Sequence, residues 1–264
     1  MNKVIIALTA LSGVALADYS WDPTQDYSYK WDFSQTNTQN NQTGVLGGTV
    51  TNTFVTESVE GVGSALKEGT ENGKYWEVNT NSFLYDAITA ATTTNATLTL
   101  TVDYYWTGAQ WGENILHVGQ HETGIAYGLS NGYISLTTGT ATDADFSAAK
   151  TDLRLTANAW NTITYTLSNN QWTATLNGVT SEAKTLGDIS WNTDASEVNK
   201  YSIGILAPGW TNGASGLNDS GCQMANLTIT YTAAPTGGDV VPEPATATLS
   251  LLALAGLAVR RRRK

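Results

Sequence analysis

The sequence contains very few of the residues that cross-link a chain or carry common catalytic chemistry. Its 264 residues include one cysteine, Cys222, and two histidines, His117 and His121. A single cysteine excludes an intramolecular disulfide, so the hydrophobic core has to stabilise the fold, and a chain of this length can form one. We expect Cys222 to lie buried at the start of a strand. We expect the two histidines to be hydrogen-bonded at a strand end; a zinc site would need a third ligand such as Glu122.

Basic side chains are also scarce, with 13 Lys and Arg against 23 Asp and Glu. Six of the thirteen lie near the two termini, so the body from Asp18 to Val241 has seven basic and 22 acidic side chains, a net charge of −15. Such a charge opposes binding to nucleic acid and to anionic membrane surfaces. It also argues against direct binding of sulfated or sialylated polymers unless a cation bridges them.

The C-terminus has three parts in a fixed order. The tripeptide Pro242-Glu243-Pro244 leads into an apolar run, Ala245 to Val259, and the chain closes on Arg260, Arg261, Arg262, Arg263 and Lys264. At about 1.5 Å per residue a helix over this run measures roughly 22 Å, less than the ~30 Å of a bilayer core. We predict a C-terminal hydrophobic helix that spans a membrane only marginally, with its basic end on the cytoplasmic side and the body outside.

This order of elements resembles the PEP-CTERM sorting signal of exported bacterial proteins, over residues 242–264. The resemblance implies an exosortase as a partner, which recognises the tripeptide, removes the tail and passes the body to the cell surface. An ordinary C-terminal membrane anchor is the alternative. Either way we expect a protein of the cell envelope or cell surface, attached to the membrane by its C-terminus transiently or permanently.

The N-terminus has the pattern of a secretory signal peptide. Lys3 precedes an apolar stretch, and the small residues Ala15 and Ala17 flank Leu16 as signal peptidase requires. We therefore assign residues 1–17 to a signal peptide with cleavage before Asp18. Residues 18–232 form one domain, and residues 233–241 form a linker with one proline and two glycines.

Apolar residues in the body alternate with polar ones at a period of two, which is typical of strands with one buried face. Asn177-Gly178 predicts a tight hairpin turn. The fold class we predict is an all-β, antiparallel jelly-roll sandwich of roughly a dozen strands, with segment 18–91 too irregular to place in detail. Strands are predicted at residues 48–55, 74–78, 96–105, 114–118, 124–129, 133–137, 152–155, 162–168, 171–177, 201–206 and 227–231.

Residues 114–232 resemble the concanavalin A-like and laminin-G-like superfamily of lectins and glucanases. The resemblance lies in a glycine-linked strand pair over 124–136, a strand opened by Trp160, a hairpin ending in Asn-Gly over 172–178, and a later strand from Tyr201. It implies a β-sandwich in which the first strand, near Trp31, pairs with the last, near Leu227. It also implies glycan or protein binding, although a fold does not by itself define a function.

The glucanases of that superfamily carry Glu-x-Asp-x-Glu on one strand, and this motif is absent from the sequence. Asp143 and Asp145 have the nearest spacing, but they lie in a polar stretch that we interpret as a loop. We therefore predict a protein that is not an enzyme. Calcium is the one cofactor we consider, and the oxygen ligands available to it are Asp143, Asp145, Asp152, Asn218 and Asp219.

Nine tryptophans are the main candidates for ligand contact, because an indole face stacks on the C–H face of a sugar. Trp21, Trp31, Trp76, Trp160 and Trp172 fall in or beside strand patterns, and we expect them in the core. The others lie in glycine-rich or polar loops. The predicted glycan site consists of Trp106, Gln110, Trp111, Trp210, Asn212 and Asn218, and the alternative is that these rings close the ends of the sandwich.

Three functions fit these observations. The first is a non-catalytic, cell-surface β-sandwich that binds glycan or another extracellular ligand. The second is a structural coat or matrix protein, which the high content of Thr, Asn and Gly and the sparse charge also suit. The third is a divergent polysaccharide-degrading enzyme, which the missing carboxylate pair disfavours.

Overall fold

The computed structural model of the protein describes most of the predicted domain. The described residues are 6–7, 21–31, 55–67, 76–78, 83–108, 112–119, 123–139, 147–191, 201–203 and 221–235. Contacts divide the chain into two compact units, Met1–Ala234 and Pro235–Lys264, and the division falls in the predicted linker. The predicted signal peptidase site at Ala15 and Ala17, the sorting tripeptide and the C-terminal helix lie outside the described residues. Among the described helices, none is long and apolar enough to cross a membrane.

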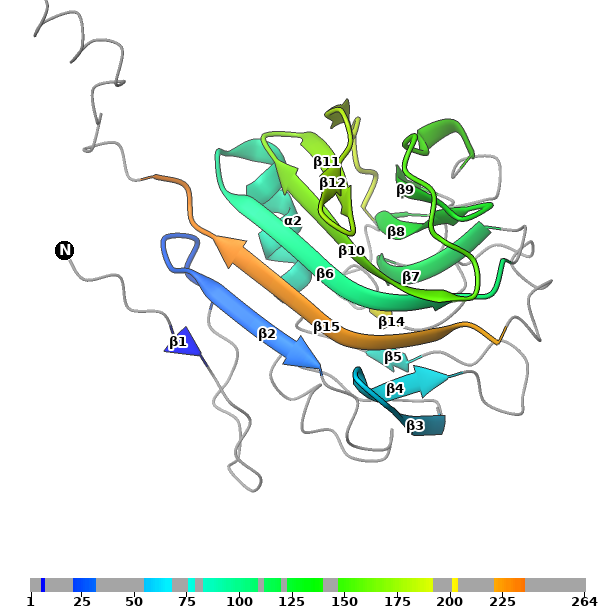
Figure 1. The fold of residues 1–264 in the computed structure, drawn as a ribbon. Helices are drawn as coiled ribbons and strands as arrows, with labels where there is room; N and C mark the ends of the chain where they lie inside the picture. Colours follow the sequence, from blue (N-terminus) through cyan, green and yellow to red (C-terminus); the bar gives the residue numbers. More distant parts are fainter. Residues whose placement is uncertain are drawn as a thin grey trace, which may run out of the picture. The chain divides into compact units, whose positions relative to one another are not determined.

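The larger of two sheets forms one face of the sandwich (Figure 1). Its strand order is β1 (Ile6–Ala7), β2 (Tyr27–Trp31), β15 (Gln223–Thr232), β6 (Thr97–Trp106), β10 (Ala159–Ser168), β11 (Gln171–Leu176) and β12 (Val179–Thr180). The short strand β13 (Lys184–Thr185) pairs with β11, while β4 (Gly63–Lys67) pairs with β15 and with β3 (Val55–Val59). Except for the β1–β2 pair, which is parallel, every strand pair described in this sheet is antiparallel.

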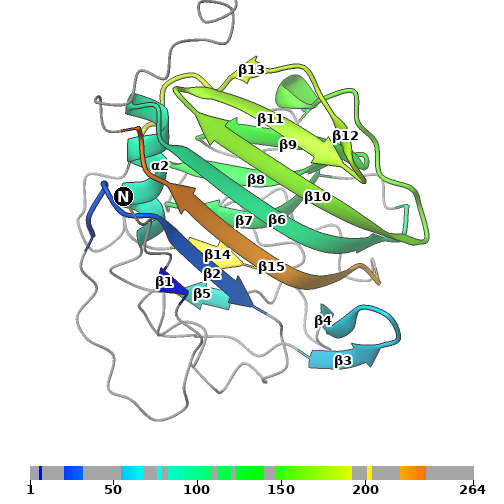
Figure 2. The same cartoon turned by 60° about the vertical axis from the view of Figure 1, so that its left-hand side comes forward.

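The smaller sheet lies behind the larger one (Figure 2). Its order is β5 (Trp76–Val78), β14 (Tyr201–Ile203), β7 (Gly112–Val118), β8 (Ile125–Ser130) and β9 (Tyr133–Thr138), and all of its described pairs are antiparallel. The chain passes from β6 in the larger sheet to β7, β8 and β9 in the smaller one, and then returns to β10. This two-sheet antiparallel arrangement confirms the predicted all-β sandwich.

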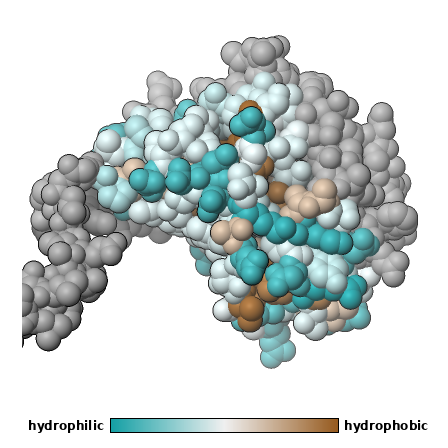
Figure 3. Space-filling view, turned by 90° about the horizontal axis from the view of Figure 1, so that it is seen from above, coloured by the Kyte–Doolittle hydropathy of each residue, from teal (hydrophilic) through white to brown (hydrophobic). Residues whose placement is uncertain are grey.

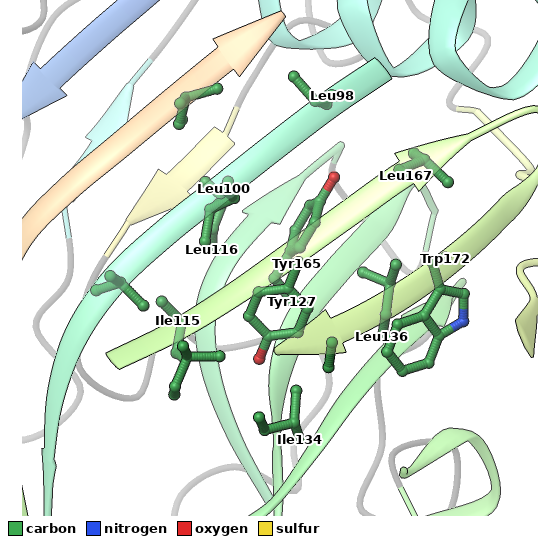
Figure 4. Close-up of a cluster of buried hydrophobic side chains, with 14 of the residues drawn as sticks. Leu98, Leu100, Ile115, Leu116, Tyr127, Ile134, Leu136, Tyr165, Leu167 and Trp172 are labelled. Carbon is green, nitrogen blue, oxygen red and sulfur yellow. The ribbon is translucent and has the colours of Figure 1, made fainter. Parts of the chain in front are cut away.

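Alternation along the long strands builds the core between the sheets. Along β6 the side chains alternate strictly between partly exposed and buried, and the buried ones are Leu98, Leu100, Val102, Tyr104 and Trp106. Leu100 and Tyr165 of the larger sheet point toward Leu116 and Tyr127 of the smaller one (Figure 4). Burial of apolar area of this kind contributes about 25 cal/mol per Å² and is the main stabilising term.

Threonines occupy most of the solvent face of the larger sheet. Thr97, Thr99 and Thr101 on β6 lie beside Thr162, Thr164 and Thr166 on β10, and beside Thr228, Thr230 and Thr232 on β15. Some hydroxyls pair across strands, as in the 3.0 Å contact between Thr101 Oγ1 and Thr164 Oγ1. Threonine suits a half-exposed strand without adding charge. Figure 3, which views the molecule from above, shows a surface that is mostly hydrophilic or neutral, with only small separate hydrophobic groups.

One helix, α2 (Phe83–Thr93), packs against β6 and β10, and the sequence prediction of a body almost without helix missed it. Its buried residues are Leu84, Ala87, Ile88 and Ala91, at the spacing i, i+3, i+4 and i+7 that defines one helix face. This spacing is present in the sequence, within the segment 18–91 that was too irregular to place in detail. The helix ends where three consecutive threonine hydroxyls donate back to carbonyls of its last turns: Thr92 to Ile88, Thr93 to Thr89 and Thr94 to Ala90.

Most predicted strands that fall on described residues are confirmed, with their ends shifted by a few positions. The first and last strands pair as expected, with Trp31 opposite Leu227. Both Asn-Gly turns have positive φ at each residue, 50° and 78° at Asn131 and Gly132, and 48° and 89° at Asn177 and Gly178. The predicted strand at 152–155 is reduced to a single antiparallel bridge, between Arg154 and Tyr133, flanked by hydrogen bonds from Ile134 N to Leu153 O and from Leu155 N to Gly132 O.

Removing the hydroxyl group from each of two adjacent core tyrosines should have different effects on stability. Their rings pack edge to face with centroids 5.3 Å apart, but the Tyr165 hydroxyl donates a 2.8 Å bond to Gly128 O, whereas the buried Tyr127 hydroxyl has no hydrogen-bond partner among the described residues. We expect Tyr165→Phe to lower the free energy of unfolding by about 1–2 kcal/mol, because Gly128 O loses its cross-sheet donor. Tyr127→Phe should be neutral within about 0.5 kcal/mol or stabilising. Urea unfolding of both variants measures the difference, and equal losses would contradict it.

Candidate ligand-binding site

Of the six residues predicted to bind glycan, the structure describes only Trp106. Its ring is buried, with 2% of the side chain exposed, at the end of β6. Trp106 thus takes the alternative position considered above, as a ring that closes one end of the sandwich. Gln110, Trp111, Trp210, Asn212 and Asn218 lie outside the described residues, so their part in the predicted site stays a prediction.

The Trp106 ring is held between a turn and a guanidinium group. A Cβ placed on Gly132, in the β8–β9 turn, would stand only 2.4 Å from the Trp106 ring, so glycine is required there for contact as well as for its φ of 78°. The Arg154 guanidinium lies over the same ring at 5.3 Å from its centroid. With both groups against it, the indole has no open face for a sugar ring.

Backbone and side-chain hydrogen bonds fix this end of the sandwich. Asn158 N donates to Trp106 O, and Leu155 N donates to Gly132 O. The buried side chain of Asn161 accepts from Thr156 N and donates to the carbonyls of Thr156 and Ala159. The segment between β9 and β10 is therefore tied to both sheets, and the side chains that it carries are well positioned.

A pair of aromatic rings faces solvent at the same end of the larger sheet. Tyr105 on β6 is directly opposite Trp160 on β10, with ring centroids 5.7 Å apart and planes inclined by 58°. Both side chains are partly exposed, and they interrupt a face that elsewhere carries mainly threonine. Large rings on the solvent face of a sheet need an explanation, whereas buried ones do not.

Amide and carboxylate groups border this aromatic pair. Gln223 is opposite Tyr105 on β15, and its Nε2 donates to Glu57 Oε1 on β3. Asp103 lies two residues before Tyr105, on the same face of β6. It accepts hydrogen bonds from Thr162 Oγ1 at 2.7 Å and from Asn226 Nδ2 at 2.9 Å. Two partly exposed rings with fixed donors and acceptors at their edge can contact a sugar, with its C–H groups on the rings and its hydroxyls on the polar groups.

The sequence analysis missed Tyr105 and wrongly assigned Trp160 to the core, although the alternation contained the signal. Tyr105 continues the series Thr97, Thr99, Thr101 and Asp103, whose side chains face solvent. Trp160 likewise has the parity of Thr162, Thr164 and Thr166. Among the other tryptophans expected in the core, Trp172 is buried, Trp21 is partly exposed, and the side chains of Trp31 and Trp76 are outside the described set.

A second cluster, of one aromatic ring and two cations, lies at the β8–β9 turn. The Tyr133 ring has Lys150 Nζ at 5.2 Å from its centroid and the Arg154 guanidinium at 5.5 Å. Arg154 Nε also donates to Asn131 O at 3.2 Å. Both cations therefore lie within the ~6 Å at which a ring attracts a positive charge.

His117 and Cys222 are structural in the described part of the chain. His117 is 1% exposed and its Nε2 donates to Thr123 O at 3.1 Å, while its Nδ1 has no described partner. Burial lowers the pKa of His117 to about 4. Cys222 is fully buried beside the Thr107 hydroxyl, as predicted. Within the described ranges no group of three or more His, Cys, Asp or Glu side chains could hold a metal ion; of the calcium ligands considered, only Asp152 is described, and it is exposed.

The C-terminal resemblance is confirmed by comparison with protein families. Residues 240–264 match the PEP-CTERM protein-sorting motif. The chain therefore carries a signal for export, for sorting to the cell surface or envelope, and for processing by an exosortase. No curated protein matches the sequence.

Solved structures with a similar fold are β-sandwiches of low sequence identity. A conserved carbohydrate esterase of the Shiga toxin-encoding bacteriophage phi24B is 13% identical with a TM-score of 0.50, over 77% of this chain and 97% of that one. Domain 4 of an extracellular arabinanase from Geobacillus stearothermophilus, in complex with arabinotriose, is 15% identical with a TM-score of 0.49, over 78% and 92%. A protein of unknown function from Shewanella oneidensis MR-1 is 11% identical with a TM-score of 0.49, over 88% and 94%. At these identities the likeness is one of fold.

The contact between Gly132 and Trp106 predicts a large effect of adding one methyl group. Gly132→Ala should cost about 1–2 kcal/mol for the positive φ and a further 1–3 kcal/mol for displacing the ring. Gly178→Ala is the matched control, because Gly178 is the second residue of the other Asn-Gly turn and its added Cβ meets nothing within 4 Å. Chemical denaturation compares the two, and similar losses would show that the Trp106 contact adds nothing.

His117 predicts a specific pH dependence of stability. Its pKa of about 4 in the folded protein lies below the 6.5 of an unperturbed histidine, so protonation favours the unfolded chain. This contribution is fully present above about pH 6.5 and is lost, by about 3 kcal/mol in total, as the pH falls to about 4. His117→Gln should flatten the dependence in this window relative to wild type. Urea titrations between pH 4 and 7.5 test this, and parallel curves for the two proteins would refute it.

Proposed function

We propose that the body is a non-catalytic, concanavalin A-like or laminin-G-like module that binds a glycan outside the cell. The observation that carries the proposal is the Tyr105–Trp160 pair, two partly exposed rings on a sheet face of small hydroxyl side chains. Exposed aromatic area of this kind costs solvation free energy, and contact with a ligand recovers it.

The polar groups around the pair fit hydroxyl recognition. Gln223 has a carboxamide beside Tyr105, and the carboxylates of Asp103 and Glu57 are held by neighbouring side chains. Groups held in this way lose little rotamer freedom when a ligand binds, which favours affinity. The missing Glu-x-Asp-x-Glu motif supports a binding role over hydrolysis.

The cellular setting agrees with this proposal. A protein sorted to the surface or envelope meets polysaccharides of its own cell and of its surroundings. Two of the proteins with a similar fold are an esterase of carbohydrates and an arabinanase domain in complex with arabinotriose. Because those likenesses concern the fold alone, the proposal rests on the ring pair.

A glycan array probed with the purified full-length protein tests the proposal. We expect specific binding that Trp160→Leu weakens by at least about tenfold, or about 1.4 kcal/mol. Trp191→Leu is the matched control, because Trp191 forms another described pair of partly exposed rings, with Tyr85 at a centroid distance of 4.8 Å. Both substitutions should lower the melting temperature, but only the first should affect binding.

Each alternative has a distinct outcome in that experiment. Binding that is unchanged in a folded Trp160→Leu protein would exclude the ring pair as the site. No binding to any glycan would favour the coat or matrix function. An arm with chelator tests the calcium prediction, since loss of binding there and its recovery with added calcium would show that the ion is required.

A further inference from the structure

We infer that the glycan carries carboxylates, and that Arg154 and Lys150 bind them. This inference rests on the proposed glycan-binding function and assigns the chemical class of the ligand. It concerns the cation cluster around Tyr133. This cluster is separate from the Tyr105–Trp160 pair, but both contact or adjoin the end of β6. The link is Trp106, which follows Tyr105 in β6 and whose ring contacts the Arg154 guanidinium.

The position of Arg154 is unusual for a chain of this composition. It is the only arginine in the body, since the other four form the run Arg260–Arg263. In a body with 22 acidic side chains, an exposed arginine would ordinarily be paired with one of them. Among the described residues neither Arg154 nor Lys150 forms an ion pair, and Asp152, two positions from Arg154, is not bonded to it.

Among the described residues, the two terminal nitrogens of Arg154 have no acceptor. Its guanidinium lies over the rings of Trp106 and Tyr133, with Cζ at 5.3 and 5.5 Å from the ring centroids, and its Nε donates to Asn131 O. The edge formed by the two terminal nitrogens matches the two oxygens of a carboxylate. Because the ring contacts and the Nε bond already restrain the side chain, binding a carboxylate costs little further conformational entropy.

Lys150 supplies a second positive charge over the same ring. Its Nζ is 5.2 Å from the Tyr133 centroid, and its three donors have no acceptor among the described residues. Two cations near one tyrosine give a local positive potential on a protein whose net charge is −10. The net charge repels polyanions in general, so affinity for one has to come from a local site of this kind.

The experiment compares polygalacturonate with its methyl ester, which has the same backbone without the charges. We expect the full-length protein to bind the polyuronate at least about tenfold more tightly than the ester. Arg154→Gln should remove that preference and Lys150→Gln should reduce it. Arg154→Lys, which keeps the charge but loses the planar fork, should retain only part of it. Lys30→Gln is the control, because it removes one exposed charge from β2 of the larger sheet, whereas Tyr133 is on β9 of the smaller sheet.

The outcomes separate this inference from the function on which it rests. Equal binding of polyuronate and ester would overturn the carboxylate assignment and leave glycan binding intact, whereas no binding to any array glycan would overturn both. Dextran sulfate bound as tightly as polygalacturonate, with the same dependence on Arg154, would replace carboxylate by anions in general. If Arg154→Gln loses the fold, then Arg154→Lys and Lys150→Gln still decide, and a preference unchanged in both would assign the cluster a purely structural role.

Discussion

The alternation of side chains between the two faces of the long strands (their parity) is the constraint on which the rest of this structure depends. Along β6 and β10 every second side chain enters the space between the two sheets, and β15 does the same from Leu227 to Tyr231, after a bulge between Ala225 and Thr228. A shift of one residue would exchange the two faces. Tyr165, Leu100 and Trp106 are in the core for this reason. For the same reason Tyr105, Trp160 and the threonines face water, so the parity that builds the core also selects the surface rings.

The end of β6 shows how one strand serves both the core and the surface. Trp106 closes the core there, held by Gly132 and by the guanidinium of Arg154. Its neighbour Tyr105 points the opposite way and pairs with Trp160. The aromatic pair and the cation cluster are therefore both positioned by neighbours of Trp106, one in sequence and one in space.

The acidic charge and the many surface hydroxyl groups suit a protein that is exported from the cytoplasm. The body is strongly acidic, which keeps it soluble and repels other anions, while threonines cover the larger sheet without adding lysine. The core, in turn, tolerates uncharged polar groups such as His117, which is neutral because burial disfavours the imidazolium. Charged carboxylates are tolerated at the surface because water solvates them, whereas buried polar groups such as His117 stay neutral because water does not reach them.

The sequence by itself determined the sandwich class, the two Asn-Gly turns, the pairing of first and last strands, the buried cysteine and the sorting motif. The strand pairing was implied by the superfamily resemblance, and the others follow from local patterns: a period of two, a dipeptide that tolerates positive φ, or a short ordered string of residues. The spacing of helix α2 was just as local, and it was overlooked because the surrounding segment was irregular. Other outcomes depended on contacts between residues far apart in the chain. Three outcomes were decided only by the tertiary structure: that Trp106 is buried while Trp160 is partly exposed, that residues 152–155 form a single bridge to β9, and that the Arg154 guanidinium lies over the rings of Trp106 and Tyr133. The reason is that packing across the two sheets sets which rings and charges meet.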